Sequence, residues 1–282
     1  MGFPGPSLAE RLGRDPDARP VVFNGDDLGM CRAQNEATLA ALVDGHLSSA
    51  TLMVPCPWAY AAARDAIAAS APVGVHLTLT SEWDRYRWRS LNGDPSLADA
   101  DGFLPRDLGG LFATATLDAA RAECFAQVEQ ALAWGVDVTH VDSHMGANQV
   151  REDFFDIYLD VAAEFDLPLR MAPIVLEEPQ GFPQRDAAAA RGLWFCDDLV
   201  LAGGDADLWR GLLELRRPGV TECFVHAALD TPELHAAADD ADQRVTDHWL
   251  ATSPESPFAG LDLVTYTEIR DAQRAARCSS PT

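Results

Sequence analysis

Short apolar runs alternate with longer amphipathic segments along this chain. The runs have the length of buried strands, and the segments repeat apolar residues at helical spacing. The predicted strands are 21–23, 49–54, 73–79, 136–141, 167–170, 222–225 and 261–264, and the predicted helices are 33–43, 58–69, 117–134 and 154–165. Such alternation predicts an α/β fold with a parallel sheet covered by helices. The number of repeats favours a TIM-like (β/α) barrel, regular or distorted, over an open sheet.

Residues 80–115 interrupt this alternation with Gly, Pro and Asp and with Trp83, Tyr86 and Trp88. A long irregular connection inside a compact domain is usually functional or disordered, and aromatic residues argue against disorder. We therefore expect a long loop or lid at 80–115, either as a cover that sets substrate choice or as a packed flap without a ligand role. Residues 1–282 show no repeat or linker, so we expect one domain, with a flexible tail at 272–282.

Charge and composition narrow the choice of partners. The 282 residues include 21 basic and 44 acidic side chains, which gives a net charge of −23. Such a surface repels phosphate backbones and anionic lipids, so neither nucleic acid nor a membrane is expected as a partner. A homodimer stays open. The chain has no lysine, which excludes Schiff-base chemistry, pyridoxal enzymes and Walker-type phosphate loops.

The six cysteines are scattered and form no C-x-x-C pair, so a zinc ribbon or a thioredoxin-like motif is not expected. Scattered cysteines in a chain of this size are typical of buried thiols in a reducing compartment. Residues 1–20 lack the apolar core of a secretory signal, and no apolar run is long enough to span a bilayer. The sequence therefore predicts a cytoplasmic protein.

Carboxylates and imidazoles lie within or directly after four of the predicted strands. They are Asp26 and Asp27 in the run 24–29, His76 in 74–78, His140, Asp142 and His144 in 139–144, and His226 after Val225. Each group alone has an ordinary explanation, such as a helix-capping turn or a satisfied core histidine. Because the carboxyl ends of parallel strands share one face, we expect these groups to meet there. One Asp and two His with open positions form a hydrolytic metal site.

Three motifs resemble the YdjC-like carbohydrate deacetylase family, which includes chitooligosaccharide deacetylases. They are Asn-x-Asp-Asp-Leu-Gly at 24–29, Gly-Val-His-Leu-Thr-Leu-Thr at 74–80 and Thr-His-Val-Asp-Ser-His at 139–144. Residues 45–53 match the family's second strand, and the resemblance runs from 21 to 230. It implies a (β/α) barrel, one divalent metal ion, and removal of acetyl groups from N-acetylated sugars or oligosaccharides.

The resemblance also assigns roles to individual residues. The implied roles are metal ligation by Asp27, His76 and His144, general-base catalysis by Asp26, acid catalysis or stabilisation by His226, and orientation of the ligands by His140 and Asp142. Separately, the flat faces of Trp83, Tyr86 and Trp88 suit stacking on a sugar. The chain departs from the family at 145–148, where further histidines are usual, and at 227–228, where His-Pro-Gly is usual. These departures bear on the substrate more than on the metal.

The metal and the exact reaction stay open at this point. Imidazole and carboxylate ligands suit Zn²⁺, whereas Mg²⁺ prefers oxygen ligands, and the family is often described with Mg²⁺. The alternatives to a sugar deacetylase are a metal-dependent amidase with a non-sugar substrate and a non-catalytic sugar-binding barrel. The presence of both Asp26 and Asp27 argues against the binding barrel, because such a protein needs no general base beside a ligand.

Overall fold

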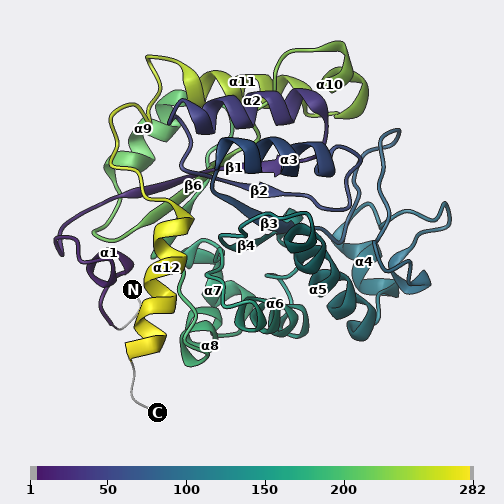
Figure 1. Ribbon diagram of the computed structural model, residues 1–282, viewed down its shortest axis with the longest axis horizontal. Helices are drawn as coiled ribbons and strands as arrows, with labels where there is room; N and C mark the ends of the chain where they lie inside the picture. The colour runs from purple at the N-terminus through teal and green to yellow at the C-terminus, as the bar shows by residue number, and fades with distance from the viewer. Residues whose placement is uncertain (1–4, 280–282) are drawn as a thin grey trace.

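A curved sheet of six parallel strands lies at the centre of the computed structural model, which describes residues 5–279 (Figure 1). The strands are β1 (Val21–Leu28), β2 (Ser49–Leu52), β3 (Val73–Leu77), β4 (Val141–Ser143), β5 (Asp198–Val200) and β6 (Thr221–Val225). They pair in the order β4-β3-β2-β1-β6-β5, so the sheet extends on both sides of β1. Every residue of β1, β2 and β3 is buried, as expected for parallel strands covered on both faces.

Helices surround the sheet in the predicted alternation. They are α1 (Leu8–Arg11), α2 (Arg32–Val43), α3 (Ala59–Ala69), α4 (Leu108–Thr114), α5 (Leu117–Ala133), α6 (Glu152–Glu164), α7 (Ile174–Gln180), α8 (Gln184–Ala190), α9 (Ala206–Glu214), α10 (Pro232–Ala237), α11 (Ala241–Thr252) and α12 (Tyr266–Ser279), with the 3-10 helices η1 (Pro95–Leu97) and η2 (His144–Gly146). Figure 1 shows α2, α3 and α11 along one side of the strands and α5 and α6 along the other. No helix among residues 5–279 has the length and apolar character needed to cross a membrane.

A few isolated backbone hydrogen bonds close the barrel, in the place that a seventh regular strand would take. Val141, at the start of β4, forms an isolated parallel bridge with Leu169. The Leu169 N–H donates to the carbonyl of Trp194 at 3.1 Å, and the chain then continues into β5, which pairs with β6. The sheet, the 167–170 segment and β5 therefore form a ring. This confirms the predicted fold class, a distorted (β/α) barrel.

Several predicted elements are wrong in extent. The strand predicted at 136–141 begins only at Val141, and the strands predicted at 167–170 and 261–264 are reduced to single bridges at Leu169 and Leu263. Pro168 interrupts the first of these segments because proline has no N–H to donate to a neighbouring strand. Apolar composition correctly predicts that residues 167–170 are buried, whereas only Val264 of 261–264 is buried. Composition does not fix how many ladder bonds such a segment makes.

The flexible tail predicted at 272–282 is also wrong as far as the structure describes it. Residues 272–279 belong to α12, and residues 280–282 lie outside the described part. Gln273 is buried on this helix, where its side chain accepts from Trp194 N–H at 2.7 Å and donates to Asp166 Oδ1 at 2.9 Å. Most charged residues of this helix are at least partly exposed, whereas Gln273 and Ile269 are buried.

The segment 80–115 is a folded flap. It contains η1 and α4, and Trp88 in its first half is only 2% exposed. The Trp88 indole N–H donates to the Thr80 carbonyl at 2.8 Å. Glu123 of α5 accepts hydrogen bonds from the backbone of Leu91 and Asn92, both at 3.0 Å. The first bond ties Trp88 to the start of the segment, and the other two attach the flap to α5.

Candidate metal centre

The carboxyl end of β1 is distorted in a way that brings two adjacent aspartates to one place. The pairing of β1 with β2 is regular up to Gly25, but its register shifts before Leu28. Within this bulge Asp27 has a φ of 62°, in the left-handed region. Successive side chains of a regular strand point to opposite faces, and a bulge re-aims one of them. Asp26 and Asp27 are therefore both buried inside the barrel mouth, near the same histidine.

Asp27, His76 and His144 form a compact triangle. Asp27 Oδ1 lies 3.2 Å from His76 Nε2 and 3.3 Å from His144 Nδ1, and the two ring nitrogens are 3.2 Å apart. Ligand atoms about 2.1 Å from a metal, at angles of about 90–110°, would be about 3.0–3.4 Å apart. The triangle therefore has the dimensions of a metal site. Its members come from β1, β3 and the residue after β4, and none of their side chains is more than 5% exposed.

A carboxylate supports each histidine from the side opposite Asp27. His76 Nδ1 lies 2.5 Å from Asp142 Oδ1, and His144 Nε2 lies 3.0 Å from Glu82 Oε2. A carboxylate only accepts hydrogen bonds, so the ring nitrogen that faces it carries the proton. In the neutral rings this leaves His76 Nε2 and His144 Nδ1 with free lone pairs, and these two atoms face Asp27. Metal-binding histidines are usually oriented by such a carboxylate.

The unpaired oxygen of Asp27 shows that the triangle fits a cation. Asp27 Oδ2 accepts a hydrogen bond from Arg244 Nη2 at 2.9 Å, but the buried Oδ1 accepts none from any described residue. A buried acceptor without a donor is costly, and as long as both rings are neutral the nitrogen lone pairs beside it offer no proton. A divalent ion placed among the three atoms would satisfy all of them.

Negative charge around the triangle also favours a bound cation. Burial by itself lowers the pKa of His76, but Asp142 outweighs this effect and raises that pKa to about 10. Burial likewise lowers the pKa of His144, but Glu82 outweighs it and raises that pKa to about 9. Without a metal, protons on the imidazoles therefore compensate the surrounding carboxylates. A metal ion would replace those protons and supply the same compensation.

Asp26 lies next to the triangle but has a different partner. Its carboxylate accepts hydrogen bonds from Arg170 Nη1 at 2.6 Å, Arg170 Nη2 at 2.8 Å and Asn24 Nδ2 at 2.8 Å. Burial raises the pKa of Asp26, but Arg170 outweighs burial and holds that pKa below its usual value. Arg170 also pairs with Asp142 at 2.8 Å and Glu222 at 2.7 Å. One guanidinium thus fixes three buried carboxylates.

His226 follows β6 and lies on the Oδ2 side of Asp27. Its Nε2 is 3.9 Å from Asp27 Oδ2, and its Nδ1 is 3.7 Å from Asp247 Oδ2. Burial lowers the pKa of His226, but Asp27 and Asp247 together raise it above the usual value. With its side chain 31% exposed, His226 is far more accessible than His76 or His144. It can exchange a proton with a molecule bound at the site.

A cavity of about 440 Å³ opens over these residues. Buried polar side chains form its deeper part: Asp26, Asp27, His76, His144, Arg170 and Arg244. Glu82 and His226, which are half-buried, and the exposed Asp240 also line it. Apolar residues line the rest of it together with Ser143, Gly146, Gln149 and Gln180; the apolar ones are Met145, Val150, Ala172, Pro173, Leu176, Leu199, Leu201 and Phe224. A cavity of this size accommodates a small organic molecule such as one or two sugar rings.

His140 lies elsewhere, so its predicted role in orienting the ligands is wrong. Its ring stacks on Tyr266 with 3.5 Å between the centroids, and its Nδ1 pairs with Thr139 Oγ1 at 2.9 Å. It precedes β4, and a strand rises about 3.3 Å per residue, so His140 belongs to a lower layer of the barrel than Asp142. Gly74 makes room for this ring, because a Cβ there would lie 2.4 Å from it.

The aromatic residues of the flap form part of the core, so the predicted stacking on a sugar is corrected. Trp83 and Trp88 are 5% and 2% exposed, and their ring centroids are 5.5 Å apart. Tyr86 packs against Trp88, and its hydroxyl donates to the Met30 carbonyl at 2.5 Å. None of the three residues lines the cavity. Of the two interpretations of this segment, the structure supports the packed flap.

Three charged residues of the site were not identified from the sequence. Glu82 lies in the flap, Arg170 ends a predicted strand, and Arg244 lies in α11, which no predicted element covers. A single charged residue in a polar segment is usually solvated, so the sequence does not mark Glu82 or Arg244 as site residues. It does mark Arg170, because Arg170 stands at the carboxyl end of an apolar run, as other site residues do.

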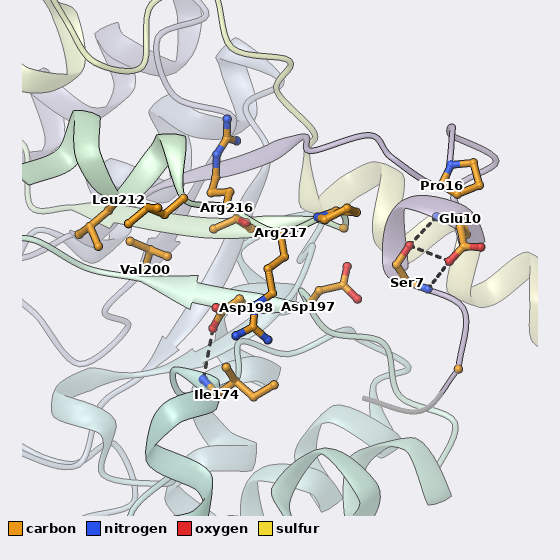
Figure 2. Close-up of a pocket in the computed structure, with 15 residues that line it drawn as sticks. Ser7, Glu10, Pro16, Ile174, Asp197, Asp198, Val200, Leu212, Arg216 and Arg217 are labelled. Atoms are coloured by element: carbon orange, nitrogen blue, oxygen red, sulfur yellow. Dashed lines mark hydrogen bonds between the residues drawn. The ribbon is translucent and has the colours of Figure 1, made fainter. Parts of the chain in front are cut away.

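A second cavity, of about 380 Å³, lies beside the first residues of β5 and β6 (Figure 2). Figure 2 shows Arg217 reaching toward Asp198 and Asp197 there. Both carboxylates are occupied by backbone amides, since Asp197 accepts from Val220 at 2.7 Å and Asp198 from Ile174 at 3.2 Å. The groups of described residues that could hold a metal all lie at the first cavity. We assign no site to the second.

Known proteins are similar to this chain in sequence and in fold. Residues 20–257 match the family described as YdjC-like protein. A carbohydrate deacetylase from Thermus thermophilus is 32% identical over 279 residues, which cover 94% of this chain and 98% of that protein. A carbohydrate deacetylase from Geobacillus stearothermophilus is 30% identical, with 89% and 98% covered. A crystal structure from Enterococcus faecalis, 21% identical, shares the fold with a TM-score of 0.77 over 88% of this chain and 97% of that one.

Proposed function

Because this chain belongs to the YdjC-like family, we propose that it is a metal-dependent hydrolase that removes acetyl groups from N-acetylated sugars or oligosaccharides. The relatives named carbohydrate deacetylase match it over nearly their whole length and support deacetylation. The observation that carries the proposal is the triangle of potential metal ligands beside Asp26, a carboxylate held ionised by a separate arginine. Hydrolysis of an amide requires both an electrophilic and a basic group.

Asp27, His76 and His144 would hold the metal through Oδ1, Nε2 and Nδ1. When bound, a divalent cation supplies Lewis-acid polarisation of a carbonyl group and lowers the pKa of water. Two imidazoles and one carboxylate favour Zn²⁺ or a similar transition metal over Mg²⁺, which prefers oxygen ligands.

Asp26 is the proposed general base. Arg170 keeps its carboxylate ionised and holds it in one plane through two hydrogen bonds. The carboxylate can therefore accept a proton from the water that attacks the acetyl carbon. Because Arg170 is itself anchored to Asp142 and Glu222, this orientation needs no rearrangement during the reaction.

His226 is the proposed proton donor to the leaving amine. It lies at the cavity, and Asp27 and Asp247 favour its protonated form. When the bond between the acetyl carbon and the sugar nitrogen breaks, this imidazolium would protonate the nitrogen and so prevent the amide from re-forming. The Asp247 carboxylate also accepts a hydrogen bond from the His226 backbone N–H at 2.9 Å, which fixes the position of this residue.

We also propose a cytoplasmic location. All six cysteines are free, and five of them are buried. Free thiols are typical of reducing compartments, whereas secreted proteins tend to pair them.

Release of acetate from N-acetylglucosamine oligomers tests the proposed reaction. We expect the wild-type protein to be inactive after chelation and to regain activity when Zn²⁺ is added. We expect Asp26→Asn to bind Zn²⁺ but to stay inactive. Hydrolysis of simple anilides without any release from sugars would instead identify a non-sugar amidase. Binding of the oligomers without acetate release by Zn²⁺-loaded protein would identify a sugar-binding barrel.

A further inference from the structure

Four aliphatic side chains stand exposed around the cavity mouth. Met145, Val150, Leu176 and Leu201 are 44%, 38%, 44% and 53% exposed, and all four line the cavity. They are four of the fourteen large hydrophobic side chains exposed in the described part of the chain. Exposed apolar residues that gather at a cavity usually mark a binding surface. We call these four residues the apolar rim.

The apolar rim comes from three neighbouring parts of the ring. Met145 and Val150 follow β4, Leu176 lies on α7 after the 167–170 segment, and Leu201 follows β5. These parts are adjacent in the barrel, so the four side chains occupy one side of the mouth. Helix α7 buries none of its residues, so packing against the core does not explain the leucine that it presents.

The chemistry of the apolar rim suits an aliphatic chain better than a sugar ring or a phosphate. None of its members is aromatic, so it offers no flat face for stacking on a pyranose. The charges of the cavity's two arginines are already compensated, since Arg170 pairs with three carboxylates and Arg244 with two. Because the carboxylates of the lining outnumber its two arginines, the cavity offers no unpaired cationic side chain of arginine to an anionic group.

We propose that the substrate is an N-acetylated sugar that carries an aliphatic aglycone, and that the apolar rim binds this chain. The inference rests on the proposed function, which places the acetamide at the buried triangle. The deeper part of the cavity is charged and does not suit a long acyl chain, so the aliphatic group must extend toward the mouth, on the sugar side of the amide. Burial of each methylene group there favours binding.

Paired glycosides test this proposal. The substrates are the methyl and octyl β-glycosides of N-acetylglucosamine, with the octyl compound below its micelle concentration and the protein loaded with Zn²⁺. We expect kcat/KM to be at least tenfold higher for the octyl glycoside, mainly through a lower KM, because the reacting amide is the same. Leu176→Ser with Leu201→Ser should bring the octyl-to-methyl ratio close to one.

A matched control uses two leucines away from the cavity. Leu132 on α5 and Leu208 on α9 are 44% and 50% exposed and do not line it. The double variant Leu132→Ser with Leu208→Ser should keep the wild-type ratio. A third substrate, the methyl glycoside of N-octanoylglucosamine, carries the aliphatic group on the acyl side of the amide. A preference for this substrate over the octyl glycoside would overturn the proposal.

The outcomes separate this inference from the proposed function. Acetate release with an octyl-to-methyl ratio near one in the wild type, or with a ratio that the rim variant does not change, would overturn the inference alone. If neither glycoside is hydrolysed, the proposed function fails. Calorimetric titration of both glycosides then still decides the inference: tighter binding of the octyl compound that the rim variant loses would support it, and equal binding would refute it.

Discussion

At the residue scale, two adjacent aspartates acquire different chemistry from one backbone angle. The left-handed conformation of Asp27 within the β1 bulge lets its side chain face the histidines while Asp26 faces Arg170. Asp27 thereby keeps one buried oxygen without a donor, whereas both oxygens of Asp26 accept hydrogen bonds. The first arrangement suits a metal ligand, and the second suits a fixed base.

Substitution of each aspartate by asparagine should separate these roles. Asp26→Asn cannot accept a proton, so we expect kcat to fall by about 10²–10⁴-fold with an unchanged zinc content. Asp27→Asn should weaken zinc binding, and excess Zn²⁺ should partly restore activity. Elemental analysis and a zinc titration of activity measure both effects. If Asp26→Asn is the variant that zinc restores, the two roles are reversed.

Glu82 provides a second test at this scale, because it contacts only the side of His144 that faces away from Asp27. Glu82→Gln keeps the size of the side chain but no longer selects the same ring tautomer. We expect zinc affinity to fall by about 10–100-fold, measured by competition with a chelator. Asp84→Asn is the control, since Asp84 lies in the same flap with its side chain 82% exposed. Unchanged affinity in Glu82→Gln would show that the contact does not orient His144.

The sequence revealed the residues of the triangle and Asp26 because each lies near the end of a predicted strand or directly after one. It did not reveal Glu82 or Arg244, because their positions depend on how the flap and α11 fold over the barrel. It also placed His140 at the site, although the strand begins one residue later and leaves that ring in a lower layer. Alternation along a strand predicts the face of a residue but not its depth.

At the scale of elements, the 80–115 flap depends on its buried indoles. Trp88 contacts Trp83, Tyr86 and His144 and is almost inaccessible to solvent. The aromatic content predicted order correctly, but composition could not distinguish a ligand platform from a core. The burial of Trp88, its hydrogen bond to Thr80 and the hydrogen bonds from the flap to α5 decide in favour of the core.

Truncation of Trp88 should therefore reduce stability. We expect Trp88→Ala to lower the free energy of unfolding by about 3–5 kcal/mol, measured by denaturant titration. Trp249→Ala should cost about 1 kcal/mol or less, because Trp249 is 46% exposed on α11. A Trp88→Ala protein with unchanged stability and a raised KM for sugars would instead support the stacking role.

The long helices were the most predictable elements. The helix predicted at 117–134 is observed as Leu117–Ala133, and the one predicted at 33–43 as Arg32–Val43. The short strand β5 was missed because its three residues include only two apolar ones. Its pairing depends on β6, which is distant in sequence.

At the scale of the whole molecule, a bound metal would join three strand ends that covalent bonds do not connect. Asp27, His76 and His144 belong to separate parts of the chain but meet within 3.3 Å. A ligand that binds only the folded state stabilises it, by about 2.7 kcal/mol at a concentration of 100 times Kd.

Removal of the metal should accordingly lower the melting temperature. We expect chelated wild-type protein to melt at a lower temperature than the same protein after addition of Zn²⁺. His76→Ala should show no such difference, because the triangle is then incomplete. Scanning calorimetry of both proteins, with and without Zn²⁺, measures the effect. A zinc-dependent shift that persists in His76→Ala would place the metal elsewhere.

The closure of the barrel at 167–170 also has a consequence for hydrogen exchange. The amides of Leu169 and Arg170 each make a single bond outside any ladder, so we expect them to exchange with deuterium sooner than those of β1, which is paired on both sides. The Arg170 side chain extends from this closure to Asp26 on β1 and Glu222 on β6, so its ion pairs hold residues 167–170 against the barrel. Arg170→Met should speed deuterium exchange of the amides at positions 169 and 170, whereas the amides of β1 should stay protected.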